Sequence, residues 1–181
     1  MSLEIILGPM FSGKSSRILS IVSRYSALNV PIVVIKHSAD NRYSANELAT
    51  HDGRRYPCVS VAHLGDVDIR MAEVVIIEEA QFFQGLLPFV HHAVDRLNKN
   101  VILVGLDGDS NRRPFGEILE CIPLADKVEK LTALCHVCAD GTPGIFTHRT
   151  GNYDRQMMVG GQDVYKAVCR YCYLDLSASN S

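Results

Sequence analysis

The residues best suited to bind phosphate lie close to the amino terminus. Residues 8–15 read GPMFSGKS and match the pattern G-x-x-x-x-G-K-[ST]. In such a loop the backbone N–H groups point at phosphate oxygens, the lysine reaches the outer phosphates, and the final hydroxyl binds Mg²⁺. A glycine-rich turn without phosphates is the alternative, but the motif follows an apolar run and opens a helical pattern, as a phosphate loop requires. We therefore expect an ATP site at Gly8, Pro9, Met10, Phe11, Ser12, Gly13, Lys14 and Ser15.

Two adjacent carboxylates follow a run that is typical of a buried strand. Residues 74–77 read VVII, and Glu78 and Glu79 come directly after them. Ligands of open α/β sheets bind at the carboxyl ends of the strands, and phosphate-loop enzymes hold a Mg²⁺-directed acid there. One carboxylate can then serve the metal and the other a substrate proton. The alternative is a solvated helix start whose acids interact with the helix dipole. We expect Ser15 and one of these two acids to bind Mg²⁺.

Four cysteines form two C-x-x-C pairs with thirty residues between the pairs. Thiolates with this spacing can close a tetrahedral Zn²⁺ site, with each pair supplying one edge. A redox-active dithiol is the alternative, but two such pairs in a terminal segment without an aliphatic core favour a structural metal. The expected zinc ligands are Cys135, Cys138, Cys169 and Cys172.

The pattern of apolar residues predicts the elements that position these motifs. Short apolar runs predict strands at residues 3–7, 31–35, 59–61, 74–77 and 101–104. Helices are expected at residues 13–28, 62–71 and 86–98. Residues 37–56 show no periodicity and are expected to form a loop. Loops of this length are uncommon in compact domains and are often functional. Because strands alternate with helices, we predict an α/β fold in which a parallel sheet is flanked by helices.

The composition changes after about residue 131. Cysteine, glycine, threonine and aromatic residues replace the aliphatic runs, which indicates a second unit that is too small to have its own core. A bound metal would stabilise such a unit. We predict an ATP-binding α/β domain at residues 1–131, a zinc-binding domain at 132–176 and a polar tail at 177–181.

Composition and charge narrow the class of partner. The chain has 181 residues, of which 47% are hydrophobic and 21% charged, and its net charge is −2. A protein that mainly neutralises a nucleic-acid backbone needs a basic surface, so we expect small-molecule partners and no nucleic acid. No apolar run is long enough for a membrane helix, and the amino terminus lacks the basic region of a signal peptide. We expect a cytoplasmic protein without a membrane partner.

Further short motifs recur in a fixed order along the chain. They are the phosphate loop, THDG at 50–53, EAQFF at 79–83, LDG at 106–108, RRPFG at 112–116, LTAxC at 131–135 and GGxxxYxxxCRxC at 160–172. In this order and spacing the chain resembles the thymidine kinase family of the cellular and poxviral type (type II). The resemblance covers residues 3–173.

The resemblance implies a fold, an activity and a set of site residues. The fold would be a P-loop (RecA-like) core with a small zinc domain that carries a lasso-like substrate loop. The activity would be Mg²⁺-dependent transfer of the γ-phosphoryl group of ATP to the 5′-hydroxyl of thymidine or deoxyuridine, which supplies DNA synthesis, by a homotetramer. Glu79 would be the general base, Glu78 would bind Mg²⁺ together with Ser15, and Asp52, Glu78 and Gln81 would belong to the ATP site. The nucleoside site would comprise Met10, Phe82, Leu106, Gln156, Met157, Met158, Val159, Gly160 and Tyr165.

Two positions depart from the family pattern. Glu78 stands where the family usually has aspartate, and Ser110 stands where it usually has a phenylalanine beside the base. The first change adds a methylene near Mg²⁺, and the second enlarges the base pocket, so a broader deoxynucleoside kinase is one alternative. A nucleoside-monophosphate kinase with a zinc-bearing lid and a nucleic-acid-stimulated ATPase are the others. Only nine residues follow Cys172, which disfavours the lid enzyme, and the lack of basic clusters disfavours the ATPase.

Overall fold

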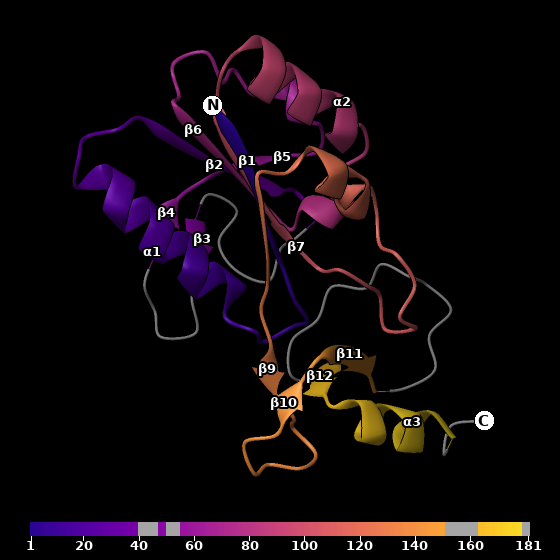
Figure 1. The fold of residues 1–181 in the computed structure, drawn as a ribbon. Coiled ribbons are helices and arrows are strands. Elements are labelled where there is room, and N and C mark those ends of the chain that lie inside the picture. Colours follow the sequence, from indigo (N-terminus) through magenta and orange to yellow (C-terminus); the bar gives the residue numbers. More distant parts are fainter. Residues whose placement is uncertain (40–46, 50–54, 151–162, 179–181) are drawn as a thin grey trace.

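A six-stranded sheet forms the centre of the molecule (Figure 1). The computed structural model describes residues 1–39, 47–49, 55–150 and 163–178. The sheet has the order β5-β2-β6-β7-β1-β8, and all neighbouring strands pair in parallel. Its strands are β1 (Ser2–Leu7), β2 (Ile32–His37), β5 (Val59–Val61), β6 (Val74–Glu78), β7 (Asn100–Gly105) and β8 (Lys127–Lys130).

Helices cover both faces of this sheet (Figure 1). Helix α1 (Lys14–Ser26) packs Ile18 and Val22 against strand residues such as Ile76. On the opposite face, α2 (Leu86–His91) buries Leu86 and Val90 in a second apolar cluster. Neighbouring residues of a strand point to opposite faces, so each buried strand contributes to both clusters. The predicted α/β architecture is confirmed.

Most of the predicted elements form. Strands are present at all five predicted positions, and α1 lies within the helix expected at residues 13–28. The helix expected at 86–98 is present as α2, which continues as the π-helical segment η3 (His92–Arg96).

The helix expected at residues 62–71 is wrong. Only one 3-10 turn forms there, η1 (Leu64–Asp66), and Val67 after it is extended (φ −103°, ψ 123°). The Oδ1 atom of Asp68 accepts the backbone N–H of Arg70 at 3.0 Å. Aspartate side chains that bond to nearby backbone compete with helix formation, which explains the irregular chain.

The loop expected at residues 37–56 is wrong in part. Within the described residues, β3 (Glu47–Ala49) and β4 (Arg55–Pro57) form an antiparallel pair. Leu48 is buried in the cluster beneath α1. Strands of only three residues offer too little alternation to be recognised in the sequence.

Strand β8 was not predicted. It reads KVEK and lies at the edge of the sheet, where it pairs with β1 and exposes most of its residues. Edge strands often carry charged residues because charge discourages pairing with another chain. Lys127 Nζ forms a salt bridge with Glu4 Oε1 of β1 at 2.7 Å. The charged residues that made the strand hard to predict therefore also link it to its neighbour.

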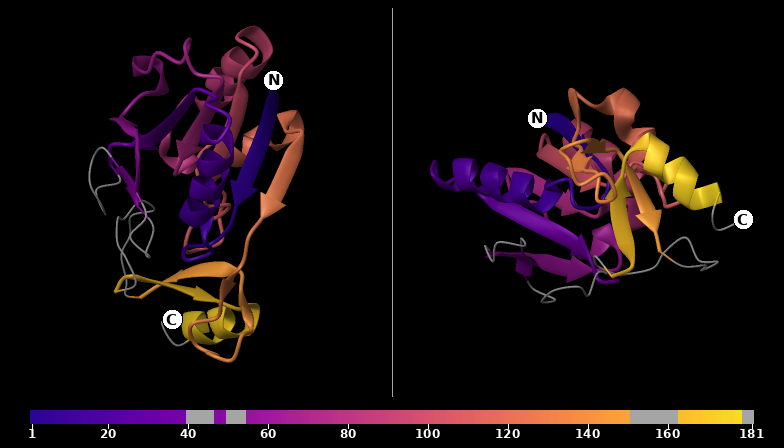
Figure 2. Two further views of the ribbon diagram at one scale, coloured as in Figure 1. Left: turned by 90° about the vertical axis from the view of Figure 1, so that its left-hand side faces the viewer. Right: turned by 90° about the horizontal axis from the view of Figure 1, so that it is seen from below.

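A small unit lies beyond the carboxyl edge of the sheet (Figure 2). It contains the pair β9 (Ala133–Leu134) and β10 (Pro143–Gly144), the pair β11 (Phe146–Arg149) and β12 (Tyr165–Val168), and helix α3 (Arg170–Ala178). Helix α3 was not predicted, and its last two residues fall in the expected tail. The domain boundaries given above stay predictions. Within the ranges that the structure covers, no helix has the length and apolar character that crossing a membrane requires.

Candidate functional site

The phosphate-loop motif connects β1 to α1 at the carboxyl edge of the sheet. Gly13 caps α1 with a left-handed backbone (φ 84°), a conformation in which other side chains are strained. The Lys14 Nζ donates to the backbone carbonyl oxygens of Gly8 at 3.1 Å and Pro9 at 2.8 Å. The lysine thus folds back over the loop and holds it as a ring at the N-terminus of a helix, an arrangement that suits an anion.

Glu78 lies close to this loop although its strand is not adjacent to β1. Strand β7 separates β6 from β1, yet the Ser15 hydroxyl donates to Glu78 Oε1 at 2.9 Å. Glu78 is buried. Hydroxyl and carboxylate oxygens are the ligand types that Mg²⁺ prefers. The structure brings together the two residues expected to bind the metal, and their role as ligands stays a prediction.

Glu79 is held in a left-handed conformation (φ 51°, ψ 44°), which is uncommon for a residue with a side chain. It caps the 3-10 helix η2 (Ala80–Phe82), and Gln81 Nε2 donates to Glu79 Oε2 at 2.6 Å. Glu79 is 9% exposed, so it is not the solvated helix start that the sequence left open. Such backbone strain costs about 1 to 3 kcal/mol and is concentrated at functional sites.

Gln81 connects Glu79 to an apolar cluster. Its Oε1 accepts the backbone N–H of Leu106 at 3.0 Å. The rings of Phe82 and Phe115 meet edge to face, with centroids 5.5 Å apart. The cluster contains Met10, Leu106, Phe115 and Tyr165, with Phe11, Phe82 and Val164 packed against it. Four residues expected in the nucleoside site therefore lie together beside the buried carboxylate: Met10, Phe82, Leu106 and Tyr165.

Gly116 lets the segment after β7 pack closely against η2, the 3-10 helix that follows Glu79. Its backbone is left-handed (φ 63°), and a Cβ atom there would collide with the carbonyl group of Gln81. Phe115 is thereby brought against Phe82. The approach fixes the segment against η2 and completes the apolar cluster.

Two residues of this region were not singled out from the sequence. Phe115 lies within the motif RRPFG, for which no site role was predicted, and it is a buried member of the cluster. Lys36 is 2% exposed at the end of β2 and lies opposite Glu78 in the parallel register. A lysine is rarely buried unless it is paired, so a charge at the end of a buried apolar run is the signal that could have identified it.

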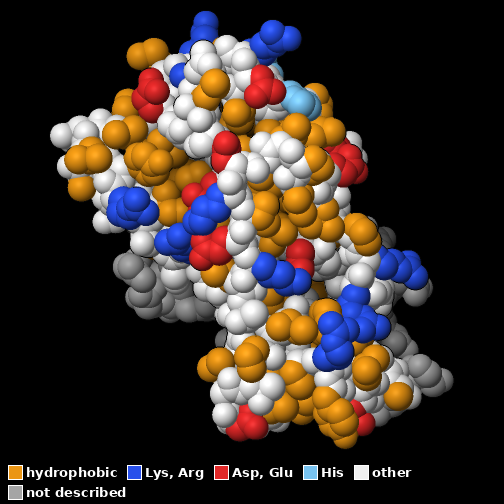
Figure 3. Space-filling model, viewed as in Figure 1, with side chains coloured by type: hydrophobic (Ala, Val, Ile, Leu, Met, Phe, Trp, Pro, Cys, Tyr) orange, Lys and Arg blue, Asp and Glu red, His pale blue; other side chains and the backbone are white. Residues whose placement is uncertain are grey.

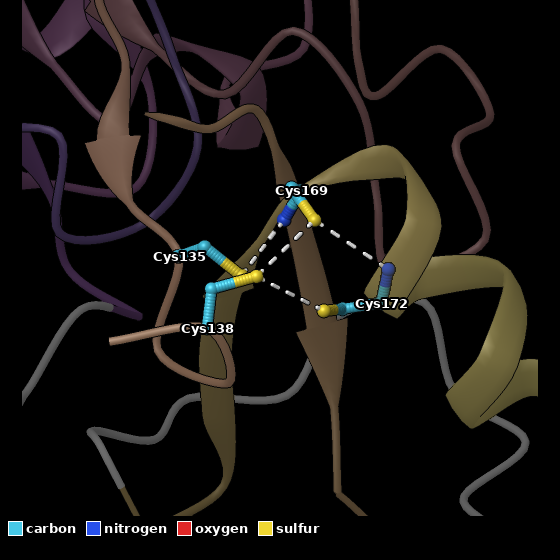
Figure 4. Close-up of side chains that lie close together, drawn as sticks. All are labelled: Cys135, Cys138, Cys169 and Cys172. Carbon is cyan, nitrogen blue, oxygen red and sulfur yellow. Dashed lines mark hydrogen bonds between the residues drawn. The ribbon is translucent and has the colours of Figure 1, made fainter. Parts of the chain in front are cut away.

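The four cysteines of the C-terminal unit converge (Figure 4). Their sulfur atoms all lie within 4.8 Å of one another. Cys138 Sγ is 3.5 Å from Cys172 Sγ and 3.9 Å from Cys169 Sγ. Tetrahedral zinc with Zn–S bonds of about 2.3 Å requires sulfur separations of about 3.8 Å, so the donor set fits this metal. The cluster is a potential metal site, as the sequence predicted.

The surroundings of Cys135 lower the pKa of its thiol. Burial raises its pKa, but hydrogen bonds from backbone N–H groups outweigh burial and lower the pKa to about 6. One of these bonds runs from Cys169 N to Cys135 Sγ at 3.2 Å. Thiolates are the form that binds metal, so the backbone favours metal binding here.

Some of the expected site residues lie outside the described residues. They are Asp52 of the ATP site and Gln156, Met157, Met158, Val159 and Gly160 of the nucleoside site. Their roles stay predictions.

A parallel α/β sheet with a phosphate-loop motif after its first strand is typical of nucleotide-binding proteins. The family model for thymidine kinase matches residues 1–173. Among curated proteins, the chain is 41% identical over 175 residues to a thymidine kinase of Monkeypox virus, covering 96% of this chain and 97% of the viral protein. It is 40% identical over 181 residues to a thymidine kinase of Oryza sativa subsp. japonica, covering 96% of this chain and 66% of the rice protein. The chain belongs to the thymidine kinase family.

Proposed function

We propose that this protein phosphorylates the 5′-hydroxyl of thymidine, and of deoxyuridine, with ATP as the donor. The family membership supports the reaction type. The observation that carries the proposal is the position of Glu79. The Glu79 carboxylate accepts a hydrogen bond from Gln81, and Gln81 accepts one from the backbone N–H of Leu106 in the apolar cluster. The adjacent Glu78 accepts a hydrogen bond from Ser15 of the phosphate loop.

Each part of the site would then have one task. Lys14 and the loop amides would hold the outer phosphates of ATP, and Ser15 and Glu78 would hold Mg²⁺, which supplies charge neutralisation when it is bound. Met10, Phe82, Leu106 and Tyr165 would enclose the base. Glu79 would accept the proton of the 5′-hydroxyl as the oxygen attacks the γ-phosphorus and the bond to the ADP oxygen breaks.

An acceptor panel tests the proposed reaction. The protein is incubated with γ-labelled ATP, Mg²⁺ and, in separate samples, thymidine, deoxyuridine, deoxycytidine, thymidylate and single-stranded DNA. We expect label on the 5′-monophosphates of thymidine and deoxyuridine. Comparable labelling of deoxycytidine would indicate the broader kinase that Ser110 leaves open. Label only on a diphosphate product, or ATP hydrolysis stimulated only by DNA, would refute the proposal.

The Mg²⁺ role of Glu78 predicts a specific defect in the variant Glu78→Gln. The amide keeps the shape of the side chain but removes the charge beside Ser15. We expect the Mg²⁺ concentration for half-maximal activity to rise about 10- to 100-fold, the range seen when a group that supports a metal is lost. Titration of activity with Mg²⁺ at fixed ATP measures this shift.

Glu73→Gln is the matched control, because Glu73 is exposed and lies just before the opposite end of β6. An Mg²⁺ requirement that is the same in Glu78→Gln, Glu73→Gln and the parent would remove Glu78 from the metal site.

The remaining expectations belong to the same proposal. Zn²⁺ would occupy the four-cysteine site, and Asp52 and residues 156–160 would complete the ATP and nucleoside sites. We also propose a cytoplasmic homotetramer on the strength of the family resemblance. Light scattering should then give four times the 20.0 kDa mass of the chain.

A further inference from the structure

A buried tyrosine of the C-terminal unit contacts the segment that follows β7. Tyr173 lies on α3 directly after Cys172 and is 6% exposed. Its hydroxyl donates to the backbone carbonyl oxygen of Ser110 at 2.8 Å. Its backbone N–H donates to the carbonyl oxygen of Cys169 at 2.9 Å. Tyr173 therefore links the cysteine cluster to a segment of the larger unit.

A cation–π contact strengthens the same junction. The Arg112 guanidinium lies 4.4 Å from the ring centroid of Tyr173 and 5.5 Å from that of Phe146 on β11. The two rings are themselves 5.4 Å apart. Figure 3 shows Lys and Arg side chains gathered where the two units meet. Arginine over an aromatic face is attracted by the electron-rich π face of the ring quadrupole, so this contact holds Arg112 in addition to the hydrogen bond that holds Ser110.

The segment contacted by Tyr173 is a compact turn. Asp109 is buried, and its Oδ1 accepts the backbone N–H groups of Asn111 at 2.8 Å and Arg113 at 2.9 Å. The Asp109 carbonyl oxygen accepts the N–H of Arg112 at 3.0 Å, and Asp109 N donates to Arg113 O at 2.9 Å. Residues 109–113 are thus cross-linked by four hydrogen bonds and should move as one body.

Residues on both sides of this turn belong to the apolar cluster that contains Met10 and Tyr165. Leu106 lies three residues before Asp109, and Phe115 lies two residues after Arg113. We propose that Tyr173 is a positioning residue for the nucleoside site, acting through the turn at 109–113 on Leu106 and Phe115. The proposal rests on the proposed function, because it assigns the apolar cluster to the nucleoside.

Kinetics of paired variants test the effect on binding. Tyr173→Phe removes only the hydrogen bond to Ser110, and we expect the KM for thymidine to rise about three- to tenfold with little change in kcat or in the KM for ATP. Tyr171→Phe is the matched control, since Tyr171 lies on the same helix and is 78% exposed. Arg112→Met should raise the same KM about two- to fivefold, and Arg113→Met should not.

Hydrogen exchange tests the coupling without any substrate. In Tyr173→Phe we expect faster exchange at the amides of residues 109, 111, 112 and 113 than in the parent, with unchanged zinc content. This measurement separates the two proposals, because it can succeed even if the parent phosphorylates no nucleoside. Unchanged exchange at these amides would overturn the positioning role. So would a thymidine KM equal to that of the parent, or KM values for thymidine and ATP that rise by the same factor.

Discussion

The variant Glu79→Gln is expected to lower kcat by about 10² to 10⁴ while leaving ATP binding nearly intact. The amide has the size of the carboxylate and can keep a hydrogen bond to Gln81, but it cannot accept a proton from the nucleoside. Glu79 also lies outside the phosphate loop, so the donor site should be unchanged. Steady-state kinetics with thymidine, together with equilibrium binding of ATP, measure the two quantities.

Two controls make this result specific. Glu73→Gln carries the same chemical change at an exposed position near the opposite end of β6 and should behave as the parent. The melting temperature of Glu79→Gln should stay close to that of the parent, because the buried side chain is replaced by one of equal volume. Turnover within threefold of the parent would exclude Glu79 as the general base.

Removal of zinc is expected to have the second large effect. Purified protein should contain about one zinc per chain, and apparent binding free energies of structural zinc sites are about 10 to 16 kcal/mol. The apolar cluster of the C-terminal unit consists of Cys135, Val168, Cys172 and Tyr173, so two of its four buried members are potential metal ligands. A unit with so small a core should lose its order when a strong chelator strips the metal.

Limited proteolysis combined with elemental analysis measures this loss. We expect cleavage within residues 132–178 after chelation, protection of the parallel sheet, and recovery of protection when zinc is returned. Cys58→Ser is the matched control, because Cys58 is buried away from the cluster and should not alter the zinc content. Intact protein that contains no zinc, or a stripped C-terminal unit that stays resistant, would contradict a structural zinc site.

The elements predicted correctly from the sequence are those whose residues are apolar because the whole element is buried. The central strands are buried on both faces, so runs such as VVII at 74–77 identify them without any knowledge of their neighbours. Strand β8 and helix α3 were missed for the opposite reason. The residues KVEK are mostly exposed, and α3 buries only Cys172 and Tyr173. An element that buries few side chains against a single neighbouring element has only a weak pattern of apolar residues in its sequence.

The candidate site was predictable where chemistry fixes the spacing. The phosphate loop and the C-x-x-C pairs have positions set by backbone geometry and by tetrahedral coordination. Gln81, by contrast, bonds to both Glu79 and Leu106, a link across 25 residues that spacing does not reveal. The burial of Lys36 beside Glu78 also depends on strand order, because β2 and β6 are neighbours in the sheet but not in the chain.

We assign ATP to the phosphate loop and thymidine to the adjacent apolar cluster, with Glu79 between them. A structure with thymidine, Mg²⁺ and a non-hydrolysable ATP analogue tests this assignment most directly. We predict that the 5′-oxygen of thymidine lies about 2.6 to 3.2 Å from the Glu79 carboxylate, the reach of a general base. The γ-phosphate should lie at Lys14 and Ser15, and the thymine ring among Met10, Phe82, Leu106 and Tyr165. A nucleoside bound away from Glu79, or phosphates bound outside residues 8–15, would contradict the assignment.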